Sequence, residues 1–116
     1  VPENNSIMLS SLAGSKLGIW VAHGEGNFNL PEEESAYNIA MKYAASTYPA
    51  NPNGSAYNTA GVTSEDGRHL AMMPHLERAI FPWQCGTYPT DKKQDDVTPW
   101  IEAFVNAKNW VAEKSR

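Results

Sequence analysis

The feature that most constrains the fold is a hairpin signal in the middle of this 116-residue chain. Two strand-like runs, residues 59–64 and 69–73, flank the dipeptide Asp66-Gly67. Asp-Gly between two such runs is typical of a tight turn, because glycine adopts positive φ without a steric penalty. The sequence therefore predicts an antiparallel β-hairpin and places the centre of the chain in a sheet.

Two further segments have strand character. Residues 16–22 are apolar on both faces, which suits the interior of a sheet that is covered on both sides. Residues 37–43 alternate tyrosine, isoleucine and methionine with polar residues, so they are predicted to form a strand with one buried face.

The last element is predicted to be a helix. Thr98 has the chemistry of an N-cap, and Pro99 suits the first helical position. The helical repeat brings together a stripe that we expect to face the core, formed by Ile101, Phe104, Val105, Lys108 and Val111 and widened by Trp100, Ala107 and Trp110.

The segments between these elements are predicted to be loops. Residues 31–35 form an acidic patch that suits a loop or a single helical turn. Residues 47–55 are rich in proline, asparagine and glycine and should form a structured loop. Residues 80–96 have no period and contain the charge cluster 91–96, so they are expected to form a long surface loop.

Charge and cysteine content narrow the classes of partner and location. The net charge of −4 and the pI near 5.3 argue against nucleic acid or an anionic membrane as the main partner. The start of the chain has no basic segment like that of a signal peptide, and no apolar run approaches the roughly 20 residues that span a bilayer. One cysteine cannot form an intrachain disulfide, which favours a reducing, cytoplasmic location.

The hairpin leads directly into the pair His75 and Glu77. If the backbone stays extended, the side-chain period of two places both on one face and turns Leu76 the other way. A carboxylate beside an imidazole accepts its ring N–H and stabilises the imidazolium, which is the orienting half of a nucleophile–base–orienter triad. From spacing alone, a strand-end histidine with a structural hydrogen bond is the commoner explanation.

The segment His23-Gly24-Glu25-Gly26 repeats the His-x-Glu spacing. One hypothesis is a divalent metal site, with zinc or iron held by imidazole and carboxylate ligands. No tight His-x-x-x-His or Cys-x-x-Cys spacing supports it. A glycine-permitted tight turn with a solvated Glu25 is the structural alternative. The metal hypothesis would use four residues, His23, Glu25, His75 and Glu77.

Taken together, the motifs resemble one family. The resemblance is to the glutamine amidotransferase domain of the phosphoribosylformylglycinamidine synthases, the large single-chain type. Its motifs occur in the family's order and cover essentially the whole chain. They are Gly14-Ser15-Lys16-Leu17, Val21-Ala22-His23-Gly24-Glu25-Gly26, Tyr48-Pro49-Ala50-Asn51-Pro52-Asn53-Gly54-Ser55, Asp66-Gly67-Arg68, Met72-Met73-Pro74-His75-Leu76-Glu77-Arg78 and Pro99-Trp100.

The resemblance implies an α/β fold of the class I glutamine amidotransferase (flavodoxin-like) type, with a mixed sheet, a β-hairpin and a C-terminal helix. Residues 1–116 would be the C-terminal portion of that domain, and the half that bears the nucleophile would be absent. The parent enzyme is a carbon–nitrogen ligase that uses glutamine as the amide donor. It converts formylglycinamide ribonucleotide to formylglycinamidine ribonucleotide in purine biosynthesis. ATP and magnesium would bind in another domain, and no cofactor is expected here.

The resemblance also implies roles for single residues. His75 would be the general base that activates a cysteine thiol, and Glu77 would orient it. His23 and Gly24 would line the glutamine pocket or support the catalytic histidine. Asn51-Pro52-Asn53-Gly54-Ser55 would be a conformational turn or a contact to the pocket or to the synthetase body.

Cys85 is not expected to be the nucleophile. It follows Pro82-Trp83-Gln84 in a loop, whereas an activated cysteine of this class sits on a sharp strand-to-helix turn. The family also places its nucleophile before the histidine in the chain. The isolated chain is therefore expected to be inactive in glutamine hydrolysis.

The expected partners are glutamine and the remainder of the same polypeptide, with no nucleic acid and no membrane. A homodimer or a swapped assembly of the fragment would cover an exposed sheet edge. Two alternatives stay open: a separate small amidotransferase subunit, and a non-catalytic metal-binding or interaction domain.

Overall fold

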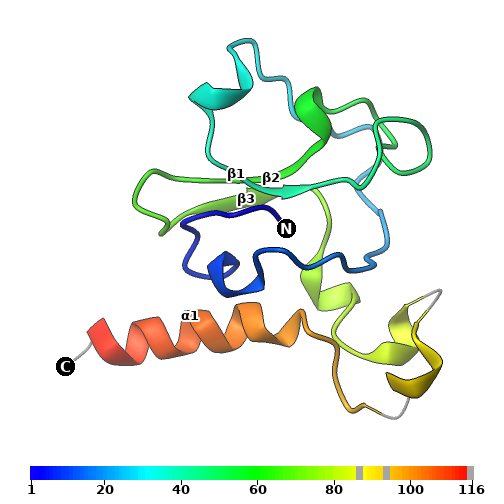
Figure 1. Ribbon diagram of the computed structural model, residues 1–116, viewed down its shortest axis with the longest axis vertical. Helices are drawn as coiled ribbons and strands as arrows, with labels where there is room; N and C mark the ends of the chain where they lie inside the picture. Colours follow the sequence, from blue (N-terminus) through cyan, green and yellow to red (C-terminus); the bar gives the residue numbers. More distant parts are fainter. Residues whose placement is uncertain (86–87, 93–94, 115–116) are drawn as a thin grey trace.

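The predicted hairpin is present in the computed structural model of the chain, which describes residues 1–85, 88–92 and 95–114 (Figure 1). Strand β2 (Thr59–Thr63) pairs antiparallel with β3 (Leu70–Met72), and Gly67 in the turn has φ +73°. Strand β1 (Ile39–Lys42) pairs antiparallel with the other edge of β2. The predictions of the hairpin and of a strand within residues 37–43 are confirmed.

The strand predicted over residues 16–22 is wrong. This segment has no regular secondary structure, and within the described ranges the sheet has the order β1-β2-β3, so the segment is not part of it. Leu17 and Ile19 are partly buried, whereas Trp20 is 58% exposed and Val21 is 39% exposed. A strand needs a neighbouring strand to pair with its N–H and C=O groups, and none of the described strands adjoins this segment. The mixed sheet is not observed either, since the described strand pairs are all antiparallel.

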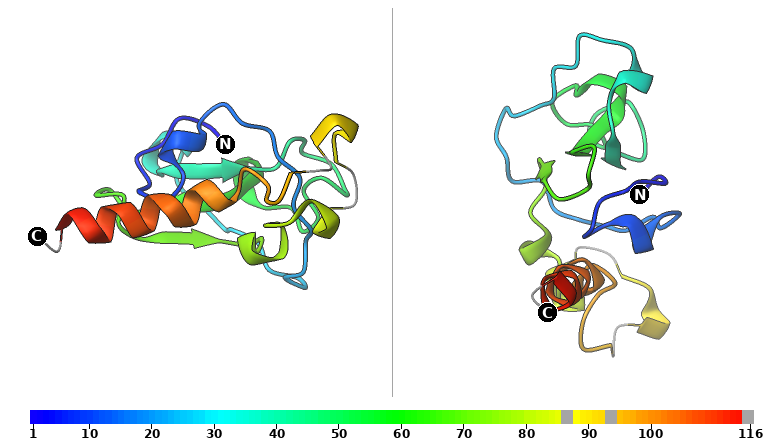
Figure 2. Two further views of the ribbon diagram at one scale, coloured as in Figure 1. Left: turned by 90° about the horizontal axis from the view of Figure 1, so that it is seen from below. Right: turned by 90° about the vertical axis from the view of Figure 1, so that its left-hand side faces the viewer.

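The N-terminal segment lies between the sheet and the C-terminal helix (Figures 1 and 2). Its short 3-10 helix, Ser10–Leu12, buries Leu12 beside the fully buried Leu9. The Ile7 N–H donates to the Gly67 carbonyl at 2.9 Å, which fastens the segment to the hairpin turn. On its other side, the Asn106 side-chain amide donates to the Met8 carbonyl at 3.0 Å. The segment therefore forms the middle layer of the molecule.

Helix α1 (Ile101–Lys114) confirms the predicted C-terminal helix, but only part of its predicted apolar stripe is buried. The buried positions are Trp100 and Ala103, whereas Phe104, Val105 and Val111 are 39%, 45% and 56% exposed. The Thr98 hydroxyl accepts the Trp100 N–H at 3.3 Å, which agrees with its predicted capping role.

The remaining segments are turns and short 3-10 helices. The 3-10 helix Glu34–Ala36 is a single turn that begins in the acidic patch 31–35 and ends one residue beyond it. Residues 80–96 contain the 3-10 helices Pro82–Gln84 and Thr90–Lys92. Of the predicted charge cluster 91–96, Lys93 and Gln94 lie outside the described residues. No helix in the described part of the chain is long and apolar enough to cross a membrane.

The hairpin turn gives a direct test of this packing. A Cβ atom on Gly67 would lie 2.0 Å from the Asn5 carbonyl oxygen, so alanine must move backbone as well as adopt a positive φ. We expect Gly67→Ala to lower the free energy of unfolding by roughly 2–5 kcal/mol. Gly54 has nearly the same φ, +72°, with no atom within 4 Å of the added Cβ, so Gly54→Ala should cost about 1–2 kcal/mol. Urea denaturation measures both, and equal losses would contradict the close approach of Asn5 and Gly67.

Candidate functional site

The His75 and Glu77 side chains meet just beyond the end of β3. His75 is extended, with φ −108° and ψ 108°, and the chain then enters the 3-10 helix Leu76–Arg78. The backbone therefore does not stay extended through Glu77 as the sequence analysis assumed. The turn still brings His75 Nδ1 to 2.9 Å from Glu77 Oε1. Leu76 is only 3% exposed, so it packs into the core as predicted.

The pair is accessible to solvent, and its hydrogen bonds favour the ionised form of Glu77. The side chains of His75 and Glu77 are 44% and 65% exposed. The backbone N–H of Glu77 itself, followed by the His75 ring, lowers the pKa of the Glu77 carboxyl below its ordinary value. The carboxylate is therefore ionised at neutral pH and accepts a hydrogen bond from Nδ1–H. This leaves Nε2 as the basic nitrogen of a neutral His75 ring.

His23 lies in a second hydrogen-bonded group. Its Nε2 is 3.1 Å from Tyr43 Oη at the end of β1, and its Nδ1 is 3.3 Å from the Asn53 side-chain nitrogen. Residues 23–26 form a tight turn in which the Gly26 N–H donates to the His23 carbonyl at 3.0 Å and Gly24 has φ +59°. Sequence reasoning missed both partners of this ring, since they lie 20 and 30 residues away along the chain.

The loop 51–55 contains two asparagines with different contacts. Asn51 is buried, and its amide group bonds to both the N–H and the carbonyl of Ser55 at 3.0 Å. Its contacts therefore hold the loop in shape. Asn53 instead directs its amide to the carbonyls of Gly24 and Gly26. Asn51 therefore has a structural role within the loop, whereas Asn53 contacts the turn 23–26.

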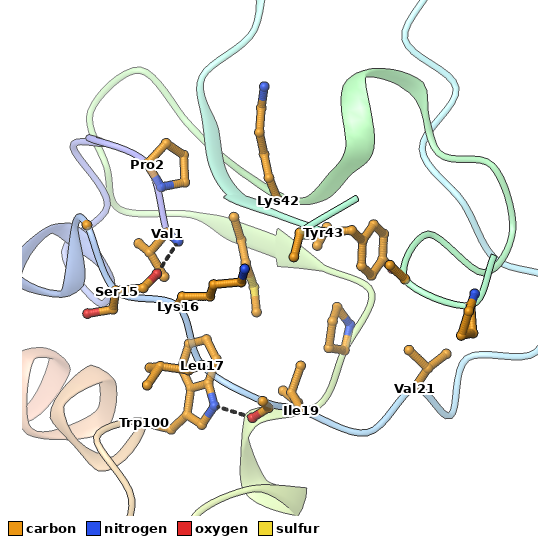
Figure 3. A pocket seen from close by; sticks show the side chains of 18 residues that line it. Val1, Pro2, Ser15, Lys16, Leu17, Ile19, Val21, Lys42, Tyr43 and Trp100 are labelled. Atoms are coloured by element: carbon orange, nitrogen blue, oxygen red, sulfur yellow. Dashed lines mark hydrogen bonds between the residues drawn. The ribbon is translucent and has the colours of Figure 1, made fainter. Parts of the chain in front are cut away.

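An open groove of about 600 Å³ runs between residues 14–21 and β1 (Figure 3). The Trp100 ring nitrogen donates to the Gly18 carbonyl at 2.9 Å along one wall. Pro74, which precedes His75, and Tyr43, which contacts His23, both line it. The groove is therefore connected to each histidine through one neighbouring residue, whereas His23 and His75 are not among the residues that line it.

Cys85 has the wrong environment for an activated thiol. It follows the 3-10 helix Pro82–Gln84, and its Sγ lies 3.9 Å from the Phe81 carbonyl. Burial raises the pKa of the Cys85 thiol, which opposes formation of the nucleophilic thiolate. This agrees with the expectation that Cys85 does not act as the nucleophile.

The metal hypothesis is not supported by the arrangement of its ligands. Within residues 1–85, 88–92 and 95–114, no three His, Cys, Asp or Glu side chains gather where they could hold a metal ion. His23 instead places its two ring nitrogens against Tyr43 and Asn53, and His75 pairs with Glu77.

Known proteins resemble this chain over nearly its whole length. A family model described as a CobB/CobQ-like glutamine amidotransferase domain matches residues 1–111. The phosphoribosylformylglycinamidine synthase of Homo sapiens is 42% identical over 95% of this chain, and the match covers 9% of that protein. The Drosophila melanogaster protein of the same name is 38% identical over 100% of this chain and 10% of its own length. A probable chloroplastic or mitochondrial form from Arabidopsis thaliana is 39% identical over 96% of this chain and 9% of its own length. The chain thus spans about a tenth of the length of these relatives.

Proposed function

The chain belongs to the CobB/CobQ-like glutamine amidotransferase domain family, and from this premise we propose that it serves the glutaminase step of a phosphoribosylformylglycinamidine synthase. In this proposal residues 1–116 are the C-terminal portion of a class I, flavodoxin-like amidotransferase domain. The lengths of the matched relatives favour the large single-chain type over a separate small subunit. The hydrogen bond of 2.9 Å between His75 and Glu77 is the observation that carries the proposal.

We assign His75 as the general base and Glu77 as its orienter. With Nδ1–H held by the carboxylate, Nε2 takes the proton of a cysteine thiol, and the thiolate attacks the side-chain amide carbon of glutamine. The imidazolium then returns its proton to the departing nitrogen, so that ammonia leaves and a glutamyl thioester remains. Water, deprotonated by His75 Nε2, then cleaves the thioester to glutamate. The imidazolium returns its proton to the thiolate, which restores the thiol.

The reaction also needs a thiol, a site for ATP and magnesium, and a pocket for glutamine. The thiol comes from elsewhere in the longer polypeptide, because Cys85 lies in a 3-10 turn and burial raises its pKa. ATP and magnesium bind in another domain, where the ammonia converts formylglycinamide ribonucleotide to formylglycinamidine ribonucleotide. We assign His23 and Gly24 to the glutamine pocket, and the support for this is the contact of His23 Nε2 with Tyr43, which lines the groove.

The role of the carboxylate is tested by Glu77→Gln in the full polypeptide that carries this chain. The glutamine side chain keeps an acceptor oxygen but loses the charge that stabilises the imidazolium. We expect kcat for glutamine hydrolysis to fall roughly 10²-fold or more, with KM little changed. Glu113→Gln, which makes the same change on the exposed face of α1, is the matched control and should retain full activity.

Equal activity of the Glu77 and Glu113 variants would contradict the orienting role. The 116-residue chain assayed alone should show no glutamine hydrolysis. Turnover by the chain alone that is abolished by Cys85→Ser would instead make Cys85 the nucleophile and refute the assignment of the thiol to another segment.

A further inference from the structure

The side chain of Asn53 joins the loop 51–55 to the turn 23–26. Its amide nitrogen donates to the Gly24 carbonyl at 2.6 Å and to the Gly26 carbonyl at 2.9 Å. Asn27 reaches back, and its side-chain amide donates to the Asn53 carbonyl at 2.8 Å. This amide thus fastens the turn 23–26 to the loop, and just beyond the turn Phe28 adds hydrogen bonds to Ser55 and Ala56.

The two glycine carbonyls fix the orientation of this amide. If the group were flipped, Asn53 Oδ1 would face both carbonyl oxygens, and acceptors would oppose acceptors. The NH₂ group must therefore point at the turn. The third atom beside it is His23 Nδ1 at 3.3 Å. A ring N–H at this position would oppose the amide donors, which disfavours a proton on Nδ1.

This arrangement favours the neutral His23 ring that carries its proton on Nε2. This nitrogen is 3.1 Å from the Tyr43 hydroxyl, whose oxygen accepts the N–H. His75 has the opposite tautomer, because its Nδ1 faces the Glu77 carboxylate at 2.9 Å. The two histidines of the candidate site thus carry their protons on different ring nitrogens.

We propose that Asn53 is a positioning residue, which holds the turn 23–26 in place and selects the Nε2–H tautomer of His23. The turn in question packs against the segment that leads to His75, since a Cβ atom on Gly26 would lie 3.1 Å from Met73 Sδ. By holding this turn, Asn53 therefore determines the position of residues 23–26 relative to His75. The consequence for glutamine binding rests on the proposed function, whereas the tautomer does not.

The test is long-range ¹H–¹⁵N NMR of the imidazole rings of the chain, which has three histidines. At about pH 8.5, above the ordinary histidine pKa of about 6.5, we expect His23 to show a protonated Nε2 and His75 a protonated Nδ1. Asn53→Asp replaces the amide donors with acceptor oxygen. His23 should then shift its proton toward Nδ1, while His69 and His75 keep their patterns.

Asn5→Asp is the matched control. Asn5 also donates its side-chain amide to a backbone carbonyl, that of Glu65 at 2.5 Å, but in the hairpin turn. This variant should leave the His23 spectrum unchanged. The proposal is overturned if His23 carries its proton on Nδ1 in the unmodified chain, or if a folded Asn53→Asp variant retains the Nε2–H pattern. The first measurement decides the question even if the variant does not fold.

The same spectrum separates this inference from the proposed function. A His75 ring protonated on Nε2 would contradict the orienting role of Glu77 and leave the assignment of Asn53 intact. A His23 ring protonated on Nδ1 would contradict the assignment of Asn53 and leave the orienting role of Glu77 intact.

Discussion

Replacing His75 with alanine in the polypeptide that carries this chain should abolish glutamine hydrolysis, with kcat lowered roughly 10⁴-fold or more. The imidazole is assigned four proton transfers in each turnover, and its ring is the side chain that lies 2.9 Å from Glu77 Oε1. Synthesis from added ammonium salt should continue, because external ammonia replaces the product of the step that is lost. Initial rates with glutamine and with ammonium chloride measure the two activities separately.

His69→Ala is the control for this experiment. His69 is exposed on the hairpin, and its backbone carbonyl and N–H form hydrogen bonds with Thr63 and Ser64. The control should keep both activities. Loss of the ammonia-dependent activity in His75→Ala would indicate general damage to the protein, and undiminished glutamine hydrolysis would refute the assignment of the base.

Trp100→Ala should destabilise the chain by about 3–5 kcal/mol. Trp100 is 2% exposed, packs in the core beside Ala103, and donates its ring N–H to the Gly18 carbonyl at 2.9 Å. Its removal opens a cavity and leaves the Gly18 carbonyl without this hydrogen-bond donor. Because small domains are stable by only about 5–15 kcal/mol, this single change should remove much of the stability. Chemical denaturation followed by circular dichroism gives the value.

The matched control is Trp83→Ala. Trp83 is 80% exposed and stacks on Phe81 with ring centroids 5.7 Å apart. Its loss should cost about 0.5–1.5 kcal/mol, the usual range for an aromatic pair. Similar losses for the two variants would contradict the placement of Trp100 in the core.

Local signals in the sequence were enough to predict several elements. Asp66-Gly67 and its flanking runs predicted the hairpin, and Thr98 with Pro99 predicted where the last helix starts, because turns and caps depend on neighbouring residues. The strand expected in residues 16–22 failed because a strand also requires a distant pairing partner. The apolar stripe of the helix was only partly right, because Trp100 is buried together with Ala103 whereas Phe104 and Val111 stay exposed.

In the candidate site, too, contacts between neighbouring residues could be predicted and contacts between distant residues could not. The contact between His75 and Glu77 was expected from their spacing, and a 3-10 turn makes it instead of an extended strand. Tyr43 and Asn53 could not be assigned to His23, since no local pattern joins residues so far apart in the chain. The sequence motif containing Asn53 was noticed, but its two asparagines could be distinguished only by their contacts.

The middle position of the N-terminal segment has a consequence for how the molecule folds. The three strands lie within a continuous stretch of chain, so they can associate early, at a small entropic cost of loop closure. By contrast, the bond from Asn106 to Met8 spans 98 residues, and the helix reaches the rest of the protein largely through that segment. Docking of the two chain ends should therefore be a late and shared event. Their amides should exchange with solvent together, as one cooperative unit distinct from the sheet.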